Sequence, residues 1–471
     1  MQTIYDVAVI GAGAVGTAIA RELARYQLST VLVEAKSDVG TGTTKANTAI
    51  WHTGFDATPG TLEAKLLRRS YALMEDFVLE AGVPVERLGG LLVAWTEEQH
   101  RALPSLLKRA HDNGVTDVRI VSSEEVYRLE PKLSPGAWGG LLVPGESLIC
   151  PFTLPLAFAT QALLNGVDLR LNFPVQGIRQ ENGVTAIQSA SGQILGARHL
   201  VNAAGLYSDE IDHMLGHHDF TVTPRRGELI VFDKFARSLV NHIVLPVPTA
   251  VTKGVLISPT VYGNVLLGPT AEDLDDKQNT ATSQQGLQAL LEKGRAILPA
   301  LLQEEVTATY AGLRAATEHK DYQIRLHAEQ RYVCVGGIRS TGVSAAMGIA
   351  EHVSELLMEA GLKMSPKPEF KTVRMPNIGE AAPRPYQRPE LIAQNPDYGQ
   401  IVCHCEKVSL GEIRDAIHSP IPARTLDGLR RRTRAMQGRC QGFNCQAHIV
   451  DTLARETGQD PRVLLGLNVE V

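Results

Sequence analysis

The chain has 471 residues, of which 44% are hydrophobic and 21% charged, and its formal net charge is −5. This length allows two or three domains with full cores, and the charge balance excludes a dedicated nucleic-acid binder, which would need a broad basic surface. Six cysteines are too few for a disulfide scaffold. No apolar run spans a bilayer and no signal-peptide pattern is present, so we expect a cytoplasmic protein, with peripheral membrane contact left open.

The first predicted element is a buried parallel strand at residues 7–10, which runs directly into the glycine-rich stretch GAGAVG. TAIARELARY, which follows, has apolar residues at helical spacing, and STVLVEA is typical of a second strand, ending at Glu34. This order predicts a dinucleotide-binding unit: a strand, the G-x-G-x-x-G pattern, a helix, a second strand and an acidic residue at its end. The alternative is a glycine-rich turn in an ordinary α/β unit.

Each residue of this fingerprint has a physical task. Gly11 permits the tight turn, Gly13 lets the backbone approach a pyrophosphate, and Gly16 lets helix and strand pack closely. Ala14 opens the helix, whose N-terminus offers N–H groups and a positive dipole end to the phosphates. Glu34 is expected to accept the hydroxyls of the adenosine ribose.

Two later strand–turn–helix stretches favour FAD over NAD, because no second fingerprint for an NAD domain is present. Residues 197–211 end a strand in small side chains, which allow close approach to a flavin nucleotide. Residues 332–357 place a helix N-terminus where its N–H groups meet a flavin oxygen or a phosphate. Either stretch alone also fits a plain βα turn. The cofactor-binding candidates here are Ala204, Gly205, Gly337, Gly342, Val343 and Ser344.

The order of these three segments resembles the D-amino-acid-oxidase-type flavoprotein superfamily. Within it, TGTTKANTAIWHTGFDATPGTLEAKL at residues 41–66 is similar to the branch of FAD-dependent glycerol-3-phosphate dehydrogenases and L-2-hydroxyglutarate dehydrogenases, and residues 223–233, 254–273 and 310–316 match that branch too. The resemblance implies an α/β fold, in which a Rossmann-like FAD-binding domain is interleaved with an antiparallel substrate sheet above the isoalloxazine. It also implies cofactor contacts by Thr43, Thr44, Asn47 and Val175.

His52 is the first catalytic candidate, in the stretch that resembles the flavin-facing segment of the family. An imidazole at this place takes the substrate's hydroxyl proton while hydride leaves carbon for flavin N5. Two alternatives stay open: a histidine that only bonds backbone or flavin, and a covalent histidyl–flavin link.

Arg314, in the stretch YAGLRAA, is the best candidate for holding an anionic substrate group, because its planar fork suits a carboxylate or phosphate. The resemblance places this arginine over the flavin ring, and a surface salt bridge is the alternative. Lys253 and Arg339 are weaker substrate-binding candidates by the same reasoning.

One departure from the resemblance bears on the substrate. Glycerol-3-phosphate dehydrogenases of the familiar bacterial type carry an arginine–tyrosine pair shortly after the position of His52, where this chain has Phe55 and Asp56. An aspartate repels a phosphate dianion. The departure moves weight toward a 2-hydroxy acid without deciding between the two substrate classes.

The last seventy residues contain four of the six cysteines, Cys403, Cys405, Cys440 and Cys445. Four thiolates in a reducing compartment indicate a metal site. Zinc usually favours C-x2-C knuckles, whereas C-x-C followed by C-x4-C resembles the bacterioferritin-associated-ferredoxin-like domain, which holds a 2Fe–2S cluster. Zinc and bare structural thiols stay open as alternatives. The arginine run Arg430–Arg434 is either a solvated helix face or a site that offsets cluster charge and docks an acidic redox partner.

The predicted domain order follows. An FAD-dependent oxidoreductase occupies residues 1–363, with FAD-binding parts at about 1–80, 150–215 and 325–363 and a substrate domain at about 81–149 and 216–324. A Pro-rich linker or wrapped arm covers 364–400, and a small, mostly helical 2Fe–2S domain covers 401–471.

We therefore expect an FAD-dependent dehydrogenase that oxidises a small anionic secondary alcohol such as glycerol 3-phosphate, with electrons leaving through a 2Fe–2S cluster to a redox protein or a quinone. Three alternatives remain: an L-2-hydroxyglutarate or related 2-hydroxy-acid dehydrogenase, an enzyme that oxidises C–N bonds of amino acids or opines, and a non-catalytic electron-transfer subunit. Homo- and hetero-oligomers both stay open.

Overall fold

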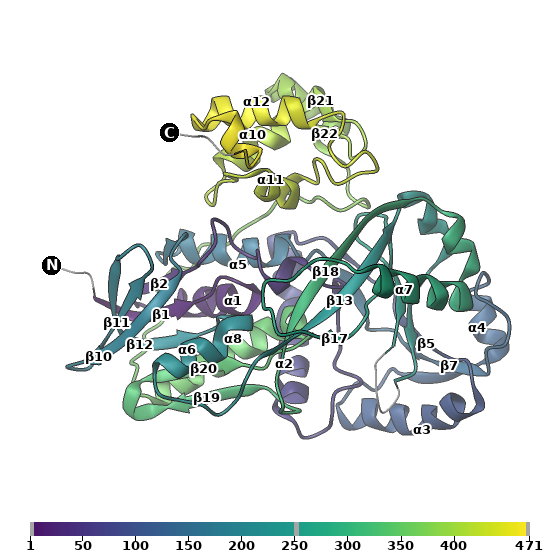
Figure 1. Ribbon diagram of the computed structural model, residues 1–471, viewed down its shortest axis with the longest axis horizontal. Helices are drawn as coiled ribbons and strands as arrows, with labels where there is room; N and C mark the ends of the chain where they lie inside the picture. Colours follow the sequence, from purple (N-terminus) through teal and green to yellow (C-terminus); the bar gives the residue numbers. More distant parts are fainter. Residues whose placement is uncertain (1–3, 249–253, 468–471) are drawn as a thin grey trace.

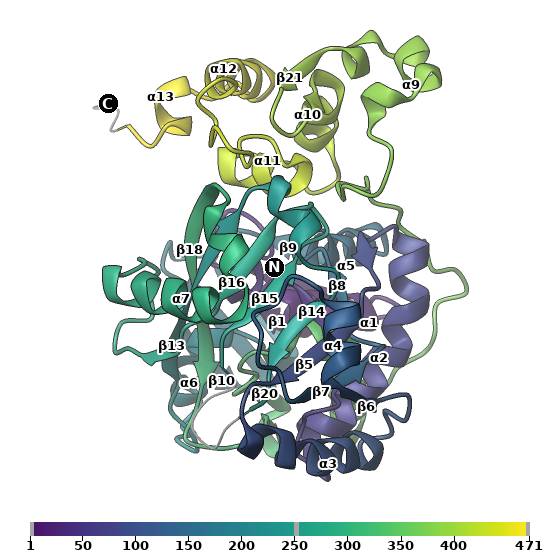
Figure 2. The same ribbon diagram turned by 90° about the vertical axis from the view of Figure 1, so that its right-hand side faces the viewer.

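A computed structural model of the chain describes residues 4–248 and 254–467. Two large sheets with their helices lie side by side, and the C-terminal residues form a separate layer above them (Figures 1 and 2). Helix α11 (Leu426–Thr433) of that layer faces the sheets. The mixed α/β architecture agrees with the fold class expected from the sequence.

The first sheet has eight strands, and its centre is parallel. Strands β9, β2, β1, β12 and β20 lie next to one another in this order and run in the same direction. The chain leaves this sheet after β2 and again after β12, so its strands come from three separate stretches of sequence. The strands are β1 (Ile4–Ile10), β2 (Thr30–Val33), β9 (Asp168–Arg170), β10 (Val175–Glu181), β11 (Val184–Ser189), β12 (Ile194–Asn202), β19 (Gln323–His327) and β20 (Tyr332–Gly336).

Helices bury the first sheet, as its continuously apolar central strand requires. Val7 and Val9 of β1 are fully buried. The helices of this part are α1 (Ala14–Leu23), α2 (Leu62–Ala81), α5 (Thr153–Leu164), α6 (Ser208–Met214) and α8 (Gly342–Glu359). At Gly348 of α8 an added Cβ would lie 2.3 Å from the Leu66 carbonyl oxygen of α2, so a side chain there would force these two helices apart.

The second sheet is largely antiparallel, as expected of the substrate domain; its one parallel pair is β14 with β5. Its strands are β5 (Gly90–Ala94), β6 (Arg119–Ser122), β7 (Gly139–Val143), β13 (Thr223–Phe232), β14 (Ile243–Pro246), β15 (Leu256–Pro259), β16 (Val265–Gly268), β17 (Glu272–Asp273) and β18 (Val306–Ala316). Its helices are α3 (Glu97–Asp112), α4 (Ser123–Leu129) and α7 (Gln284–Ile297). The turn at Gly263 joins β15 and β16, and its φ of +86° favours glycine.

A small third sheet of β3 (Ile50–Trp51), β4 (Val85–Glu86) and β8 (Ser147–Ile149) brings residues 50–52 beside residues 145–149. Short 3₁₀ helices connect the larger elements: η1 (Thr43–Lys45), η2 (Gly205–Tyr207), η3 (Lys234–Leu239), η4 (Pro299–Gln303), η5 (Ala328–Gln330), η6 (Pro385–Gln387) and η7 (Pro396–Gly399).

Residues 364–400 run along the parts of the chain that carry the first and second sheets and are fastened to them. Main-chain N–H groups of Lys367, Met375 and Glu380 donate to carbonyl oxygens of Arg25, Ala81 and Val261, respectively, over 2.8 Å each. This segment, called the arm below, then forms helix α9 (Pro389–Gln394).

Residues 401–467, called the C-terminal unit below, have a hydrophobic core of their own, built around Val408, Ile413, Leu429 and Ile449. The elements besides α11 are β21 (Ile401–Cys403), β22 (Val408–Ser409), α10 (Leu410–His418), α12 (Gln446–Thr457) and α13 (Pro461–Leu464). Among the described residues, no helix has the length and apolarity needed to cross a bilayer.

Candidate active site

The glycine-rich turn after β1 is packed too closely for any residue but glycine at two positions. Gly11 has a φ of +100°, and an added Cβ would lie 2.5 Å from the carbonyl oxygen of Ala203 at the end of β12. At Gly16 a Cβ would lie 1.8 Å from the Gly11 carbonyl oxygen. The turn therefore brings α1 against the carboxyl ends of β1 and β12, the place where parallel sheets bind nucleotides.

The N-terminus of α1 is open to a ligand. Gly13 caps it without a side-chain hydrogen bond, and no acidic residue lies in its first turn. The Thr44 hydroxyl accepts the Ala14 N–H at 3.0 Å. Glu34 accepts the N–H groups of Ala12 (2.8 Å) and Lys36 (2.9 Å), while burial, the largest effect, raises the pKa of its carboxyl. A glycine-rich turn at the positive end of a helix fits the pyrophosphate of a dinucleotide.

The other cofactor-binding candidates gather around the same edge of the sheet. Ala204 and Gly205 follow β12, Gly337 follows β20, and Gly342, Val343 and Ser344 begin α8; Val175 begins β10, and Thr43 lies in η1. The Thr43 hydroxyl donates to the Leu313 carbonyl oxygen on β18 at 2.7 Å, and the Asn47 amide to the Thr44 carbonyl oxygen at 2.6 Å. Residues 43–47 therefore join the first sheet to the second. Direct contacts of all these residues with FAD stay predictions.

His52 follows β3, and both its main chain and its side chain form hydrogen bonds. Its main-chain N–H donates to the Ser344 hydroxyl at the start of α8 at 2.9 Å. Its Nδ1 lies 2.7 Å from Oε2 of Glu146, and a quarter of the His52 side chain is exposed (25%). The structure thus brings the catalytic candidate next to the α8 N-terminus, where the sequence places flavin contacts.

Glu146 is the residue that sequence reasoning missed. Its side chain is completely buried, and its Oε1 accepts both the main-chain N–H (2.7 Å) and the hydroxyl (2.9 Å) of Thr53. A carboxylate only accepts hydrogen bonds, so this contact favours the His52 tautomer with its proton on Nδ1 and its lone pair on Nε2, the form that the predicted base requires. The one signal in the sequence is a single acid within the apolar stretch GGLLVPGESLICP.

Replacing Glu146 by glutamine is expected to slow substrate-dependent flavin reduction by about 10- to 100-fold, because an amide no longer fixes the tautomer of His52. Stopped-flow absorbance of the FAD-loaded protein measures this rate. Glu75→Gln is the matched control, because Glu75 pairs with Arg87 at the surface. A Glu146 variant with the wild-type rate at every pH would show that the carboxylate has no part in the reaction.

Arg314 lies on β18 beside β13, with its guanidinium over Gly227. A Cβ at Gly227 would lie 2.3 Å from Nη2 of Arg314, and Nη2 itself donates to the Thr270 carbonyl oxygen at 2.9 Å. Burial, followed by the charge of Arg225, lowers the pKa of Arg314. Arg225 is paired with Asp273 (2.6 Å), but within residues 4–248 and 254–467 no ion pair is formed by Arg314. A partly buried cation without a carboxylate partner is suited to binding an anion.

The two weaker substrate-binding candidates differ from Arg314. Nη2 of Arg339 lies 2.6 Å from Oε2 of Glu63, so its charge is already compensated. Lys253 lies outside the described residues.

The four cysteines of the C-terminal unit lie near one another. Burial raises the pKa of the Cys405 and Cys445 thiols most, and Cys403 and Cys440 raise the pKa of both further. In the described part of the chain no three His, Cys, Asp or Glu side chains converge as the ligands of one metal ion would. Four cysteines gathered in one small unit fit a 2Fe–2S cluster, in which each iron takes two thiolates.

The surroundings of the cysteines also suit a cluster. Main-chain N–H groups of Asn444, Gly442 and Phe443 lower the pKa of the Cys440 thiol, the hydrogen bond of Asn444 most. At Gly438 a Cβ would lie 2.4 Å from the Cβ of Cys405, so only glycine leaves room at this cysteine. N–H donors to sulfur stabilise the thiolate that iron binds.

The hypothesis that Arg430–Arg434 is a solvated face or docks a separate acidic protein is wrong for three of these residues. Arg431, Arg432 and Arg434 are 5%, 9% and 6% exposed. Each pairs with a carboxylate of the same chain, Asp38 or Glu406. Buried charges require such partners, so these side chains are not available to a second protein.

Comparison with known proteins agrees with both the predicted FAD site and the predicted iron–sulfur site. The family model described as "FAD dependent oxidoreductase" matches residues 6–356, and the "BFD-like [2Fe-2S] binding domain" matches residues 401–455. The chain belongs to the FAD-dependent oxidoreductase family. Its cofactors are FAD and a 2Fe–2S cluster.

The relatives of this oxidoreductase include two enzymes named for glycerol 3-phosphate. A glycerol 3-phosphate dehydrogenase of Caloramator mitchellensis is 37% identical over 97% of this chain and 95% of its own length. A glycerol 3-phosphate oxidase of Mycoplasma pneumoniae is 31% identical over 78% of this chain and 97% of its own length. The solved structure of L-alpha-glycerophosphate oxidase from the same organism, with FAD bound, covers 79% of this chain and 99% of its own, with 30% identity and a TM-score of 0.75.

Proposed function

We propose that this flavoprotein is a dehydrogenase that oxidises the secondary hydroxyl of glycerol 3-phosphate and passes the electrons on through its 2Fe–2S cluster. The observation that carries the proposal is the carboxylate-held His52. A hydroxyl group must lose its proton as hydride leaves the carbon, which requires a base, whereas a neutral amine has a lone pair and requires none. The His52–Glu146 pair therefore favours an alcohol over an amine substrate.

In this proposal bound FAD supplies the hydride acceptor. Nε2 of His52 takes the hydroxyl proton, and Glu146 stabilises the resulting imidazolium. Arg314 binds the phosphate and so orients the substrate carbon. Two observations support this assignment: Arg314 forms no ion pair within the described residues, and the Thr43–Leu313 hydrogen bond places it beside residues 43–47.

The C-terminal unit supports a dehydrogenase rather than an oxidase. The Mycoplasma oxidase matches 78% of this chain at nearly its full length, whereas the Caloramator dehydrogenase matches 97%. A cluster is useful to an enzyme whose electrons leave singly to a redox protein or a quinone, and it has little use where oxygen takes both electrons.

L-2-Hydroxyglutarate is the second candidate substrate. An L-2-hydroxyglutarate dehydrogenase of Bos taurus is 29% identical over 57% of this chain. Phe55 is buried and Asp56 follows it, where an aspartate disfavours a phosphate dianion. Both substrates are anionic secondary alcohols, so both use the same base and the same arginine.

Anaerobic bleaching of the flavin absorbance with a panel of compounds tests the proposal. We expect glycerol 3-phosphate to bleach the flavin fastest, followed by loss of the cluster absorbance, with little peroxide formed in air. Faster bleaching by L-2-hydroxyglutarate would show that this compound, and not glycerol 3-phosphate, is the preferred substrate. Bleaching by amino acids alone would refute an alcohol dehydrogenase, and no bleaching by any compound would favour a non-catalytic electron-transfer subunit.

A further inference from the structure

The loop of residues 36–46, called the cradle loop below, follows Glu34 and lies against the glycine-rich turn. It is fastened to the glycine-rich turn at two points. The Gly40 N–H donates to the Ala12 carbonyl oxygen at 2.8 Å, and the Ala14 N–H donates to the Thr44 hydroxyl at 3.0 Å. Any movement of the cradle loop is therefore transmitted to the turn that faces the pyrophosphate.

Helix α11 of the C-terminal unit holds the same loop from outside. Both carboxylate oxygens of Asp38 accept from Arg432, at 2.7 and 2.8 Å, and Oδ2 also accepts from Arg431 at 2.5 Å. Asp38 is 4% exposed. Burial alone would raise the pKa of Asp38, but the hydrogen bonds and charges of Arg432 and Arg431 lower it below the usual range. A buried triad of this kind is costly to break on one side only.

A second ion pair joins α11 to the other end of the cradle loop. Nζ of Lys45 lies 3.1 Å from Oδ2 of Asp427 on α11, and Asp427 also accepts from Arg431. At Gly428 a Cβ would lie 3.1 Å from Oδ2 of Asp38, so α11 approaches the cradle loop closely. Helix α11 thus forms ion pairs with both ends of the cradle loop, which lies next to the FAD site.

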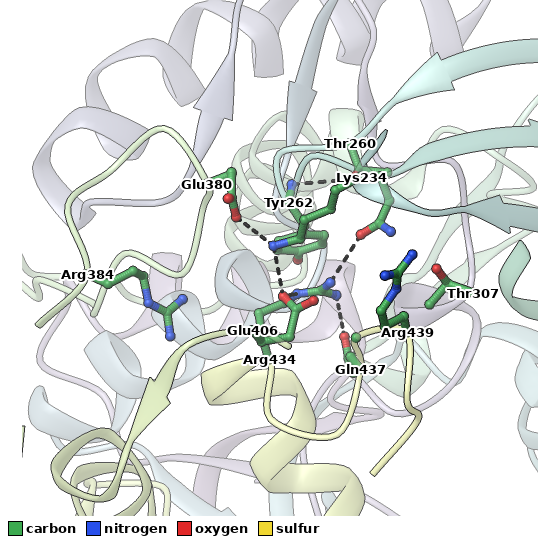
Figure 3. A network of polar contacts seen from close by, with 12 residues as sticks. Lys234, Thr260, Tyr262, Thr307, Glu380, Arg384, Glu406, Arg434, Gln437 and Arg439 are labelled. Atoms are coloured by element: carbon green, nitrogen blue, oxygen red, sulfur yellow. Dashed lines mark hydrogen bonds and ion pairs between the residues drawn. The ribbon is translucent and has the colours of Figure 1, made fainter. Parts of the chain in front are cut away.

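A third contact fixes the C-terminal unit to the second sheet (Figure 3). Lys234 bridges Glu380 of the arm (2.7 Å) and Glu406 (3.2 Å), the residue after Cys405. The Arg434 guanidinium lies 4.1 Å from the ring centroid of Tyr262, and its Nε lies 3.3 Å from Oε2 of Glu406. The unit is therefore docked at two places, through the buried Asp38 beside the first sheet and through Lys234 and Tyr262 of the second, rather than tethered by the arm alone.

We propose that α11 is a brace of the FAD site: the docked C-terminal unit keeps the cradle loop closed, so that FAD retention depends on docking. By thermodynamic reciprocity, bound FAD strengthens docking by the same factor. The proposal concerns binding of FAD only and does not depend on which substrate the enzyme oxidises.

Variants on α11 give the cleanest test, because they change no group of the flavin-binding part. In the full-length, cluster-loaded protein, Arg432→Gln is expected to raise the dissociation constant of FAD by about tenfold or more, since it leaves Asp38 buried with one partner fewer. Fluorescence of the released flavin measures this constant. Combining Arg432→Gln with Asp38→Asn should restore part of the affinity, because the double variant removes both charges.

The second readout is the rate at which a protease cleaves the arm, with iron content as a check on the cluster. Cleavage should be faster in Arg432→Gln, and added FAD should slow it in the apoprotein. Arg455→Gln is the matched control, because Arg455 pairs with Asp451 at the exposed face of α12. Wild-type FAD affinity in Arg432→Gln overturns the brace, whether or not cleavage is faster.

Asp427→Asn serves if Arg432→Gln does not fold, because Asp427 is half exposed. A rise of about threefold in the FAD dissociation constant is expected, in line with a more exposed pair. An unchanged constant in this variant also overturns the proposal.

Discussion

Replacing His52 by alanine is expected to slow substrate-dependent flavin reduction by about 10²- to 10⁴-fold, the usual contribution of a general base. The wild-type rate should vary with pH as expected for a reaction with a general base, and the variant should lose this dependence. FAD affinity should not change, because His52 contacts Ser344 through its main chain. Anaerobic stopped-flow measurements across a pH series test all three expectations.

The control for this experiment is His448→Ala, an exposed histidine on α12 of the same chain. If the His52 variant kept both the wild-type rate and its pH profile, the role of His52 would be structural and not catalytic. A flavin that stays attached to denatured wild-type protein, but is released from the variant, would instead show a covalent histidyl–flavin link.

Replacing Arg314 by methionine is expected to lower kcat/KM for the anionic substrate by about 10²- to 10³-fold, as loss of one partner of a desolvated charge pair does. The loss should fall mainly on KM, because Arg314 binds a group that does not react. Methionine keeps much of the length of the side chain, so the packing over Gly227 changes little. Steady-state kinetics with an artificial one-electron acceptor measure both constants.

Arg225→Met is the matched control, since Arg225 is the register partner of Arg314 on the neighbouring strand and is paired with Asp273. Arg314→Lys should recover part of the lost kcat/KM. If Arg225→Met impaired the enzyme as much as Arg314→Met, the anion site would have to be reassigned to the Arg225 side.

The N-terminal dinucleotide-binding unit could be predicted from the sequence because the contacts that shape it join residues close together in the chain. A buried strand, the glycines at 11 and 16 and the following helix fix one another within a few residues, and the structure shows why a side chain at either glycine would clash. The cysteine spacing was informative for the same reason, since C-x-C and C-x4-C each restrict two ligands to one turn.

The parts that the sequence did not reveal depend on contacts between distant residues. Glu146 reaches His52 across 94 residues, and Arg431 reaches Asp38 across 393. No local pattern reports such pairs. The arginine run shows the consequence: a string of charges on a short helix is typical of a solvated face, and only the carboxylates of another part of the chain turn it into a buried contact.

The arm has a kinetic consequence. Because its main chain is fastened at Lys367, Met375 and Glu380, each flavin is confined to the iron–sulfur unit of its own polypeptide. Electron exchange between the two halves is then unimolecular and insensitive to dilution. As monomers, two damaged chains, one without its cysteines and one without its histidine, would therefore not complement each other in a mixture.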